Sequence, residues 1–229
     1  MKNYNDEIEW TKKFVNEKTI SFPAEYVIRI FKGEYPNLDF NKKEFRNKKI
    51  CDIGCGDGRN IVLLDQCGFE TYGTEITKEI VEKTKVNLKK LDIDSDIRIG
   101  TNEKIPFEEN FFDYVLSWNS CYYMGKNNSF ENHVKEFNRI LKPGGYLILS
   151  IPKKTSFLFS ESEEISRGYQ KIKNDPFKVR NGAILRMFKD ENEIKENFSE
   201  FFTDFVFGSI EDDCFGLKYD WHLVVCKKS

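Results

Sequence analysis

The feature that most constrains the fold is a run of alternating glycines directly after a short apolar segment near residue 50. Lys49 to Ile53 predicts a buried strand, and Gly54, Gly56 and Gly58 follow before a segment of helical periodicity. Glycines let the backbone approach a ligand closely, and the first turn of the following helix presents unpaired backbone amides. This succession of strand, loop and helix predicts a binding site for a nucleoside.

An acidic residue at the end of the next apolar segment strengthens this prediction. Glu70 to Glu75 is a second predicted strand, and Glu75 follows Gly54 by 21 positions. A carboxylate in this position can accept hydrogen bonds from both hydroxyls of a ribose. The alternative is that the glycines only form a tight turn.

From Lys48 onward, short apolar runs alternate with helical segments, which is the pattern of a parallel sheet covered by helices. Helices are expected between the strands, with Thr77 as the cap of one of them, and Pro143-Gly144-Gly145 predicts a tight turn. The fold class is therefore α/β, Rossmann-like and doubly wound. The predicted strands are 49–53, 70–75, 96–99, 111–118, 146–151, 203–208 and 221–227.

Position 59 separates two classes of nucleoside-binding protein. The dinucleotide pattern Gly-x-Gly-x-x-Gly places its third glycine there, whereas this chain has Arg59. The sequence instead resembles the class I S-adenosylmethionine-dependent methyltransferases of small-molecule type. Three blocks in the family's order carry the resemblance: the glycine loop within Ile50 to Asn60, the Ile-Pro-Phe and Phe-Asp-Tyr-Val motifs within Ile105 to Ser117, and Leu-Lys-Pro-Gly-Gly within Phe137 to Tyr146.

The resemblance implies S-adenosyl-L-methionine as the cofactor and S-adenosyl-L-homocysteine as the product. It also implies a seven-stranded, mainly parallel sheet with an antiparallel last strand. Where many relatives place an acid against the adenine amino group, this chain has Asn102 and Glu103, and the side-chain oxygen of Asn102 is the candidate. The other implied cofactor residues are Asp52, Gly54, Cys55 and Gly56 for methionine and ribose, Glu75 for the ribose hydroxyls, Ile76 beside adenine, and Trp118 and Asn119 near the methyl group.

A single methyltransferase domain is expected over residues 1–229, because this length suits one α/β unit with elaborations. Residues 152–189 do not follow the alternation of strand and helix, and they are interpreted as an insertion that caps the active site. The expected parts are an N-terminal helical cap (1–46), a cofactor-binding half (47–151), this insertion (152–189), and a C-terminal helix with strands (190–229).

The candidate catalytic residues lie outside the three blocks. Tyr122 and Tyr123 follow the fourth predicted strand at the carboxyl edge of the sheet, where open α/β sheets bind ligands. Packing as an aromatic lid is the alternative for both. His222 begins the last strand, two residues after Asp220, and is the third candidate.

The insertion is basic, with nine Lys and Arg against four acidic residues over 153–189. Arginine binds planar oxyanions through its fork of donors, so Arg167, Arg180 and Arg186 are candidate contacts to an anionic acceptor. The alternative is that this charge only solvates the surface.

The overall composition disfavours several classes of protein. Lys and Arg number 36 against 38 Asp and Glu, a balance that does not indicate nucleic-acid binding. No apolar run long enough to cross a membrane and no signal-peptide pattern occurs, so a cytoplasmic protein without a membrane partner is expected. The six cysteines lack zinc-ligand spacing, so no metal is expected.

The sequence thus predicts an enzyme that moves a methyl group to an oxygen or nitrogen atom of a small molecule. Anionic metabolites and sugar or surface-glycan precursors are the candidate acceptors. Positioning can supply most of the rate enhancement, and the sequence designates no general base. A non-catalytic methyltransferase-like binding protein and a nicotinamide-dependent oxidoreductase remain alternatives, and the oligomeric state is not indicated.

Overall fold

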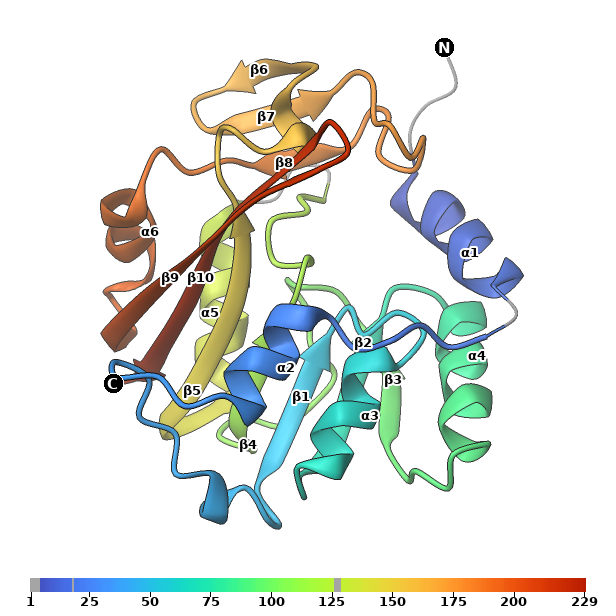
Figure 1. Ribbon diagram of the computed structural model, residues 1–229, viewed down its shortest axis with the longest axis vertical. Helices are drawn as coiled ribbons and strands as arrows, with labels where there is room; N and C mark the ends of the chain where they lie inside the picture. The colour runs from blue at the N-terminus through green and yellow to red at the C-terminus, as the bar shows by residue number, and fades with distance from the viewer. Residues whose placement is uncertain (1–4, 18, 126–128) are drawn as a thin grey trace.

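The computed structural model describes residues 5–17, 19–125 and 129–229. Its centre is a seven-stranded sheet of order β3-β2-β1-β4-β5-β10-β9 (Figure 1). Strand β10 is antiparallel to β5 and β9, while β3, β2, β1, β4 and β5 pair in parallel, so the expected Rossmann-like fold is confirmed. The strands are β1 (Lys49–Ile53), β2 (Glu70–Glu75), β3 (Asp96–Ile99), β4 (Phe112–Ser117), β5 (Leu141–Pro152), β9 (Phe202–Cys214) and β10 (Leu217–Lys228).

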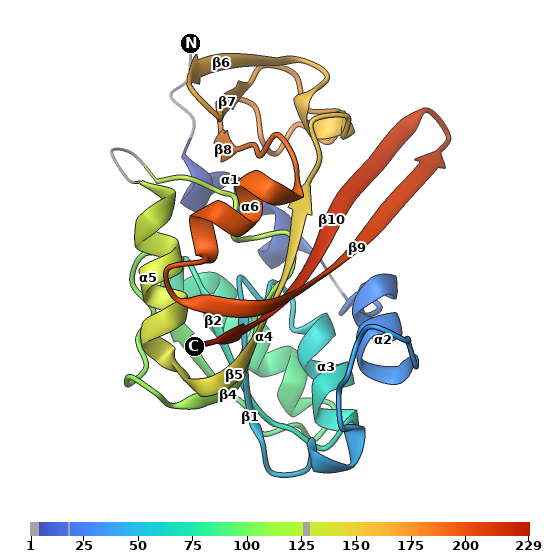
Figure 2. The ribbon, with the colours of Figure 1, turned by 90° about the vertical axis from the view of Figure 1, so that its left-hand side faces the viewer.

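Helices cover both faces of this sheet (Figure 2). One face carries α2 (Glu25–Lys32), α3 (Arg59–Gln66) and α4 (Lys78–Lys89), and the other carries α5 (Phe130–Ile140) and α6 (Glu191–Phe198). The right-handed crossovers of parallel strands require this arrangement. As expected, Thr77 caps α4, its hydroxyl accepting a hydrogen bond from the Ile80 amide at 3.4 Å.

A cluster of aromatic rings anchors residues 25–45 to the sheet. Phe31, Phe40, Phe45, Phe69 and Tyr114 are all buried, and the ring centroids of Phe45 and Phe69 lie 4.6 Å apart. Such ring pairs add directional contacts to the burial of apolar area. The segment that contains α2 and the short 3₁₀ helix η1 (Lys42–Glu44) is therefore fixed against the sheet.

The insertion contains more regular structure than expected. A 3₁₀ helix, η2 (Phe157–Phe159), precedes an antiparallel sheet of β6 (Ser162–Ser166), β7 (Tyr169–Ile172) and β8 (Ile184–Arg186). This small sheet lies at the top of Figure 1, beyond the carboxyl end of the parallel strands. Two backbone hydrogen bonds join β8 to the loop after β4, from Met124 to Ile184 at 2.9 Å and from Arg186 to Tyr122 at 2.8 Å.

The predicted turn at Pro143-Gly144-Gly145 falls inside the bounds of β5, but within the described residues none of the three pairs with β4, and Gly144 has a φ of +73°. That strand already begins at Leu141, which pairs with Phe112 of β4, and the pairing shifts register before Tyr146. The last two strands are also longer than expected, and they form a hairpin that projects past the sheet (Figure 2).

Helix α1 (Asp6–Asn16) lies apart from α2, beside the insertion and the N-terminal end of α4 (Figure 1). A hydrogen bond of 2.9 Å between the hydroxyls of Thr11 and Thr77 joins it to the start of α4. None of the helices in the described residues is long and apolar enough to span a membrane.

Candidate active site

The glycine loop between β1 and α3 has a backbone that only glycine adopts readily. Gly54, Gly56 and Gly58 have φ angles of +71°, +60° and +91°. A Cβ atom on Gly54 would lie 2.4 Å from Ser120 Oγ, and one on Gly56 would lie 2.8 Å from the ring of Phe14. Side chains are therefore excluded at these positions by both conformation and space.

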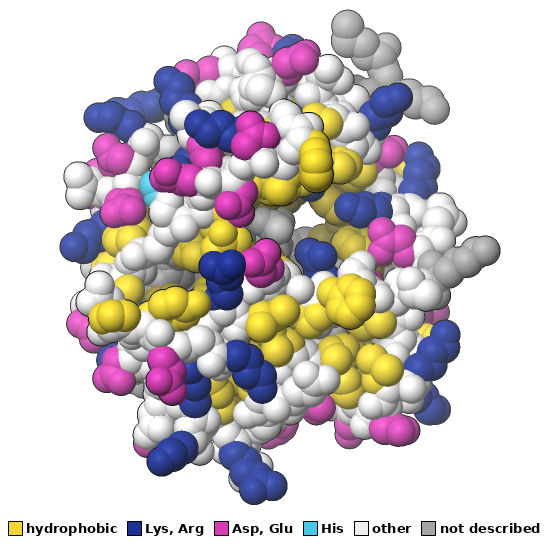
Figure 3. All heavy atoms as spheres, in the orientation of Figure 1, with side chains coloured by type: hydrophobic (Ala, Val, Ile, Leu, Met, Phe, Trp, Pro, Cys, Tyr) yellow, Lys and Arg dark blue, Asp and Glu magenta, His cyan; other side chains and the backbone are white. Residues whose placement is uncertain are grey.

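A cavity of about 760 Å³ opens above this loop, at the carboxyl edge of the sheet. Figure 3 shows this face of the molecule hollowed near its middle, with hydrophobic and basic side chains around the hollow. Its walls come from distant parts of the chain: α1, the glycine loop, the end of β2, residues 100–103, the loop after β4, and the insertion. Of the expected cofactor residues, the following line it: Gly54, Cys55, Gly56, Glu75, Ile76, Asn102, Glu103, Trp118 and Asn119.

Glu75 is held by the backbone beneath this cavity. Its Oε1 accepts a hydrogen bond from the Gly56 amide at 2.7 Å, and its Oε2 accepts one from the Ile76 amide at 3.0 Å. An ionised carboxylate has about four acceptor positions, so about two remain for a ligand. Burial raises the pKa of Glu75 to about 7, although the two amide hydrogen bonds oppose this effect.

Asn102 and Glu103 form another part of the cavity wall. The Asn102 amide nitrogen donates to the Ser120 carbonyl at 3.0 Å, while its buried Oδ1 has no hydrogen-bond partner among the described residues. Glu103 lies 3.3 Å from Nε2 of the buried His133, whose Nδ1 contacts the Cys121 carbonyl at 2.9 Å. The unpaired Asn102 oxygen is an acceptor that a ligand amino group can satisfy.

Asp52 is placed differently from the expectation that it lines the ligand. It is only 1% exposed and does not line the cavity. Burial raises its pKa to about 8, against the opposing charge of Arg59. Asp52 is therefore a buried carboxyl group behind the cavity lining, and neither of its oxygens has a hydrogen-bond partner among the described residues.

Two of the expected acceptor residues meet at the far end of the cavity. Tyr123 and Arg180 both line it, and Arg180 Nε donates to the Tyr123 hydroxyl at 2.7 Å. Burial raises the pKa of Tyr123 to about 12, against the nearby charge of Arg180. The phenol therefore keeps its proton at neutral pH.

The remaining expected acceptor residues lie outside the cavity. Tyr122 is buried behind Tyr123, its ring centroid 5.1 Å from that of Tyr123. Arg186 is buried in an ion pair of 2.8 Å with Glu193, and Arg167 is exposed. His222 borders a separate cavity next to Lys153 and α6, and burial lowers its pKa. The basic balance of the insertion therefore brings one arginine, Arg180, to this site.

Sequence reasoning missed the contribution of α1. Trp10 and Phe14 stack with ring centroids 5.6 Å apart, and both line the cavity together with Lys13. Phe14 covers Gly56, while Trp10 lies 5.8 Å from the Tyr123 ring and 5.3 Å from the Arg180 guanidinium carbon. Two aromatic residues four positions apart in a polar segment were the available signal, since helical neighbours share a face.

The charge of the cavity wall is predominantly negative. Six acidic residues line it, against three basic ones. This balance suits a ligand with cationic groups and disfavours the pyrophosphate of a dinucleotide. The described residues contain no cluster of His, Cys, Asp and Glu that could hold a metal ion.

Residues 51–149 match a protein family described as a methyltransferase domain. Over this segment the chain is similar to a methyltransferase domain, in agreement with the resemblance to the class I S-adenosylmethionine-dependent methyltransferases. The matched segment contains the glycine loop, Glu75, Asn102 and the end of β4, so it covers the side of the cavity where the sequence predicts the cofactor.

Other proteins are similar to this chain in sequence or in fold. A ubiquinone biosynthesis O-methyltransferase from Pelagibacter ubique is 25% identical over 63% of this chain, and the alignment spans 58% of that relative's own length. The PH0226 protein of Pyrococcus horikoshii has a TM-score of 0.67 at 21% identity, covering 99% of this chain and 100% of that one. A Burkholderia thailandensis 1,6-didemethyltoxoflavin-N1-methyltransferase, solved with S-adenosylhomocysteine bound, has a TM-score of 0.60 at 14% identity over 80% of this chain and 72% of that one.

The residues of the cavity fit the family's cofactor. Glu75 retains acceptor capacity for two ribose hydroxyls, and Asn102 Oδ1 is an unpaired acceptor for an adenine amino group. The acidic excess of the wall suits the sulfonium and amino cations of S-adenosylmethionine. None of these features requires a second nucleotide.

Proposed function

We propose that this protein transfers the methyl group of S-adenosylmethionine to an oxygen or nitrogen atom of a small-molecule acceptor. One observation carries the proposal: a single cavity joins the glycine loop and Glu75 to an end walled by Trp10, Tyr123 and Arg180. A cofactor and a small acceptor can therefore lie in contact within it. This arrangement also supports treating residues 1–229 as one domain, because α1, the sheet and the insertion all contribute walls.

Methyl transfer depends mainly on the alignment of acceptor, methyl group and sulfur. When bound, S-adenosylmethionine supplies an activated methyl group whose displacement is in line. Glu75 and Asn102 would orient the nucleoside, and the rings of α1 would exclude water from the space between cofactor and acceptor. The protonated Tyr123 can donate a hydrogen bond to the acceptor, but a phenol whose pKa is about 12 does not serve as a general base at neutral pH.

The proposal is tested first by calorimetric titration of the purified protein with S-adenosylhomocysteine and, separately, with NAD. We expect the homocysteine product to bind and NAD to give no heat, because the wall is acidic and position 59 is arginine. Glu75→Ala should weaken product binding by at least about tenfold, about 1.4 kcal/mol, because both ribose contacts are lost.

Turnover is measured next, as production of S-adenosylhomocysteine from S-adenosylmethionine in the presence of hydroxylated and amino acceptors. Acceptor-dependent product formation supports a transferase. Product binding without turnover on any acceptor would favour the non-catalytic alternative, and selective binding of NAD would overturn the proposal.

A further inference from the structure

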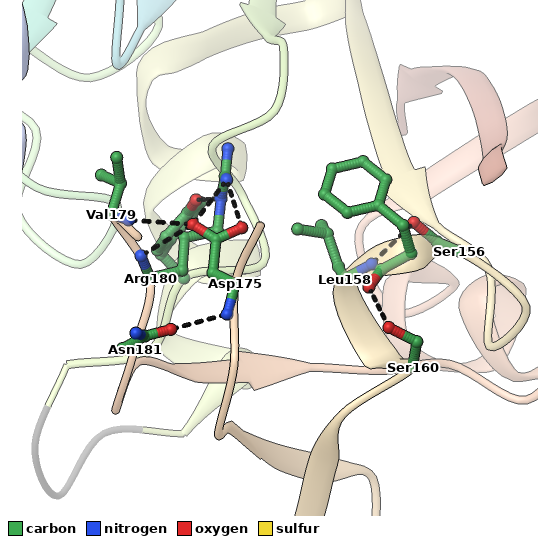
Figure 4. A network of polar contacts seen from close by, with 9 residues as sticks. Ser156, Leu158, Ser160, Asp175, Val179, Arg180 and Asn181 are labelled. Atoms are coloured by element: carbon green, nitrogen blue, oxygen red, sulfur yellow. Dashed lines mark hydrogen bonds and ion pairs between the residues drawn. The ribbon is translucent and has the colours of Figure 1, made fainter. Parts of the chain in front are cut away.

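The loop 175–181 of the insertion is built around one buried carboxylate. Asp175 is 2% exposed, and its Oδ2 accepts hydrogen bonds from the Val179 amide at 2.9 Å and the Arg180 amide at 3.0 Å. The Asp175 amide in turn donates to Asn181 Oδ1 at 2.6 Å (Figure 4). A carboxylate that collects several N–H donors fixes the backbone around it. This loop therefore presents Arg180 in a defined direction.

The Arg180 side chain is fixed by the same carboxylate and by the wall of the cavity. Its Nη1 contacts Asp175 at 3.2 and 3.3 Å, and its Nε donates to Tyr123. Its Nη2 has no hydrogen-bond partner within the part of the chain that the structure describes, although the residue lines the cavity. Nε and Nη1 are already engaged, so the two N–H groups of Nη2 remain as donors for a ligand.

Aromatic and apolar side chains also lie beside Arg180. Trp10 and Tyr123 stand edge to face at 79°, and Trp118, Met124 and Ile184 complete this end of the cavity. These two rings contact each other directly, with centroids 5.8 Å apart, so together they form one aromatic surface against which a planar ring can pack. Lys13 lies on the same helix face as Trp10, and burial together with the charge of Arg180 lowers its pKa.

We propose that Arg180 and Trp10 select an aromatic acceptor that carries a carboxylate, with the ring against Trp10 and Tyr123 and one carboxylate oxygen on Arg180 Nη2. This inference rests on the proposed methyl transfer and narrows its acceptor. Asp175 is a positioning residue, since it acts through Arg180. A phosphate monoester is disfavoured relative to a carboxylate, because its larger negative charge is repelled more strongly by a wall with twice as many acidic as basic residues.

The test uses the full chain saturated with S-adenosylhomocysteine and four probes, titrated by ligand-observed NMR. The probes are 4-hydroxybenzoate, phenol without the carboxylate, cyclohexanecarboxylate without the aromatic ring, and phenyl phosphate. We expect 4-hydroxybenzoate to bind at least about tenfold more tightly than the other three. Equal affinity for phenol would overturn the carboxylate contact, equal affinity for cyclohexanecarboxylate would overturn the aromatic one, and tighter phenyl phosphate would overturn the choice of anion.

Variants locate the contact. Arg180→Gln should remove the preference for 4-hydroxybenzoate over phenol, while Arg180→Lys should retain part of it. Arg167→Gln is the matched control, because Arg167 is exposed on the same insertion and does not line the cavity. If Arg180→Gln does not fold, Trp10→Leu against Trp10→Phe tests the ring contact, with loss expected in the first and retention in the second. An unchanged preference in Arg180→Gln, or equal loss in both Trp10 variants, would overturn the proposal.

Asp175→Asn separates positioning from direct contact. This variant weakens the ion pair between Asp175 and Arg180 and leaves the guanidinium less well positioned. We therefore expect KM for a carboxylate acceptor to rise several-fold, with kcat changed much less. Affinity for S-adenosylhomocysteine is measured in every variant. If that affinity is intact while the acceptor preference is absent, this inference fails and the proposed function stands; if wild type binds no S-adenosylhomocysteine, the proposed function itself fails.

Discussion

Glu75 illustrates how burial and hydrogen bonding compete at a single carboxylate. The side chain is 5% exposed, and two backbone amides hold its oxygens in place. Burial still dominates, so the pKa lies near neutrality. The charge of this residue therefore changes with pH in the physiological range. The affinity of any ligand that binds to its ionised form should change with it.

We expect affinity for S-adenosylhomocysteine to be about tenfold lower at pH 6 than at pH 8. Ribose hydroxyls donate to the ionised form of Glu75, and this form becomes scarce as pH falls below its pKa of about 7. Calorimetry at pH 6, 7 and 8 measures the effect. Glu75→Gln should bind more weakly at pH 8 and lose most of the slope; a wild-type affinity that is flat with pH would contradict this assignment.

Asp52 leads to a prediction about stability rather than binding. Its pKa of about 8 lies above the value of about 3.9 for an unfolded aspartate, so the folded state holds a proton that the unfolded state has released. The free energy of unfolding should therefore fall as pH rises from about 5 to 8. Asp52→Asn should reduce this slope in urea unfolding at pH 6 and pH 8, with Glu75 supplying the remainder, whereas Asp65→Asn, at an exposed carboxylate, should leave it unchanged.

At the scale of elements, the helix α1 contributes to the site although it belongs to none of the family's blocks. Phe14 packs on Gly56, and the hydroxyl pair between Thr11 and Thr77 joins the helix to α4. A second connection lies downstream, where the Ser21 amide donates to Asp57 of the glycine loop at 2.6 Å. The residues between α1 and α2 are thus hydrogen-bonded to the glycine loop, on which Phe14 packs.

Phe14→Ala should weaken S-adenosylhomocysteine binding by about three- to tenfold, because the ring that covers the loop is removed and water gains access. Val15→Ala is the control on the same helix, since Val15 is 41% exposed and does not line the cavity. Calorimetric titration of both variants checks the prediction. Equal affinities in the two variants would show that α1 does not cover the cofactor.

The elements that were predicted correctly are those marked by residues adjacent in sequence. The bounds of β1, β2 and β3 and the cap at Thr77 follow from short apolar runs, glycines and a capping hydroxyl that are adjacent in sequence. Pro143-Gly144-Gly145 also gave a local signal for a turn, and the pairing of β5 with β4 is interrupted there and resumes at Tyr146. The sequence did not indicate that Leu141, before this interruption, already pairs with Phe112, because strand pairing is a contact between distant residues.

At the scale of the whole molecule, the two ends of the cavity differed in how well they could be predicted. The cofactor end consists of residues in three recognisable blocks, and nine of the ten expected residues line the cavity. The acceptor end depends on how the insertion and α1 fold back over the sheet, which no short pattern encodes. The sequence did not distinguish Arg167, Arg180 and Arg186 as acceptor contacts. In the structure Arg180 lines the cavity and contacts Asp175, while Arg186 pairs with Glu193.

Binding of the product should stabilise the whole chain, because its cavity is walled by segments from the N-terminal helix to residue 184. At a free concentration one hundred times Kd, S-adenosylhomocysteine should raise the free energy of unfolding by about 2.7 kcal/mol. Urea unfolding with and without the ligand measures this, with NAD at the same concentration as the control. A matching increase with NAD would point to a nucleotide site of another class.

The placement of Phe14 and Trp10 one turn apart on α1 has a consequence for the binding equilibria of the two ligands. One ring covers the glycine loop and the other contacts Tyr123 and Arg180, so a single rigid helix touches both ligand positions. Whichever ligand arrives first restrains α1, and the second then binds to a helix whose conformational freedom is already reduced. Cofactor and acceptor should consequently bind with positive heterotropic coupling, and thermodynamic reciprocity requires each to tighten the other by the same factor.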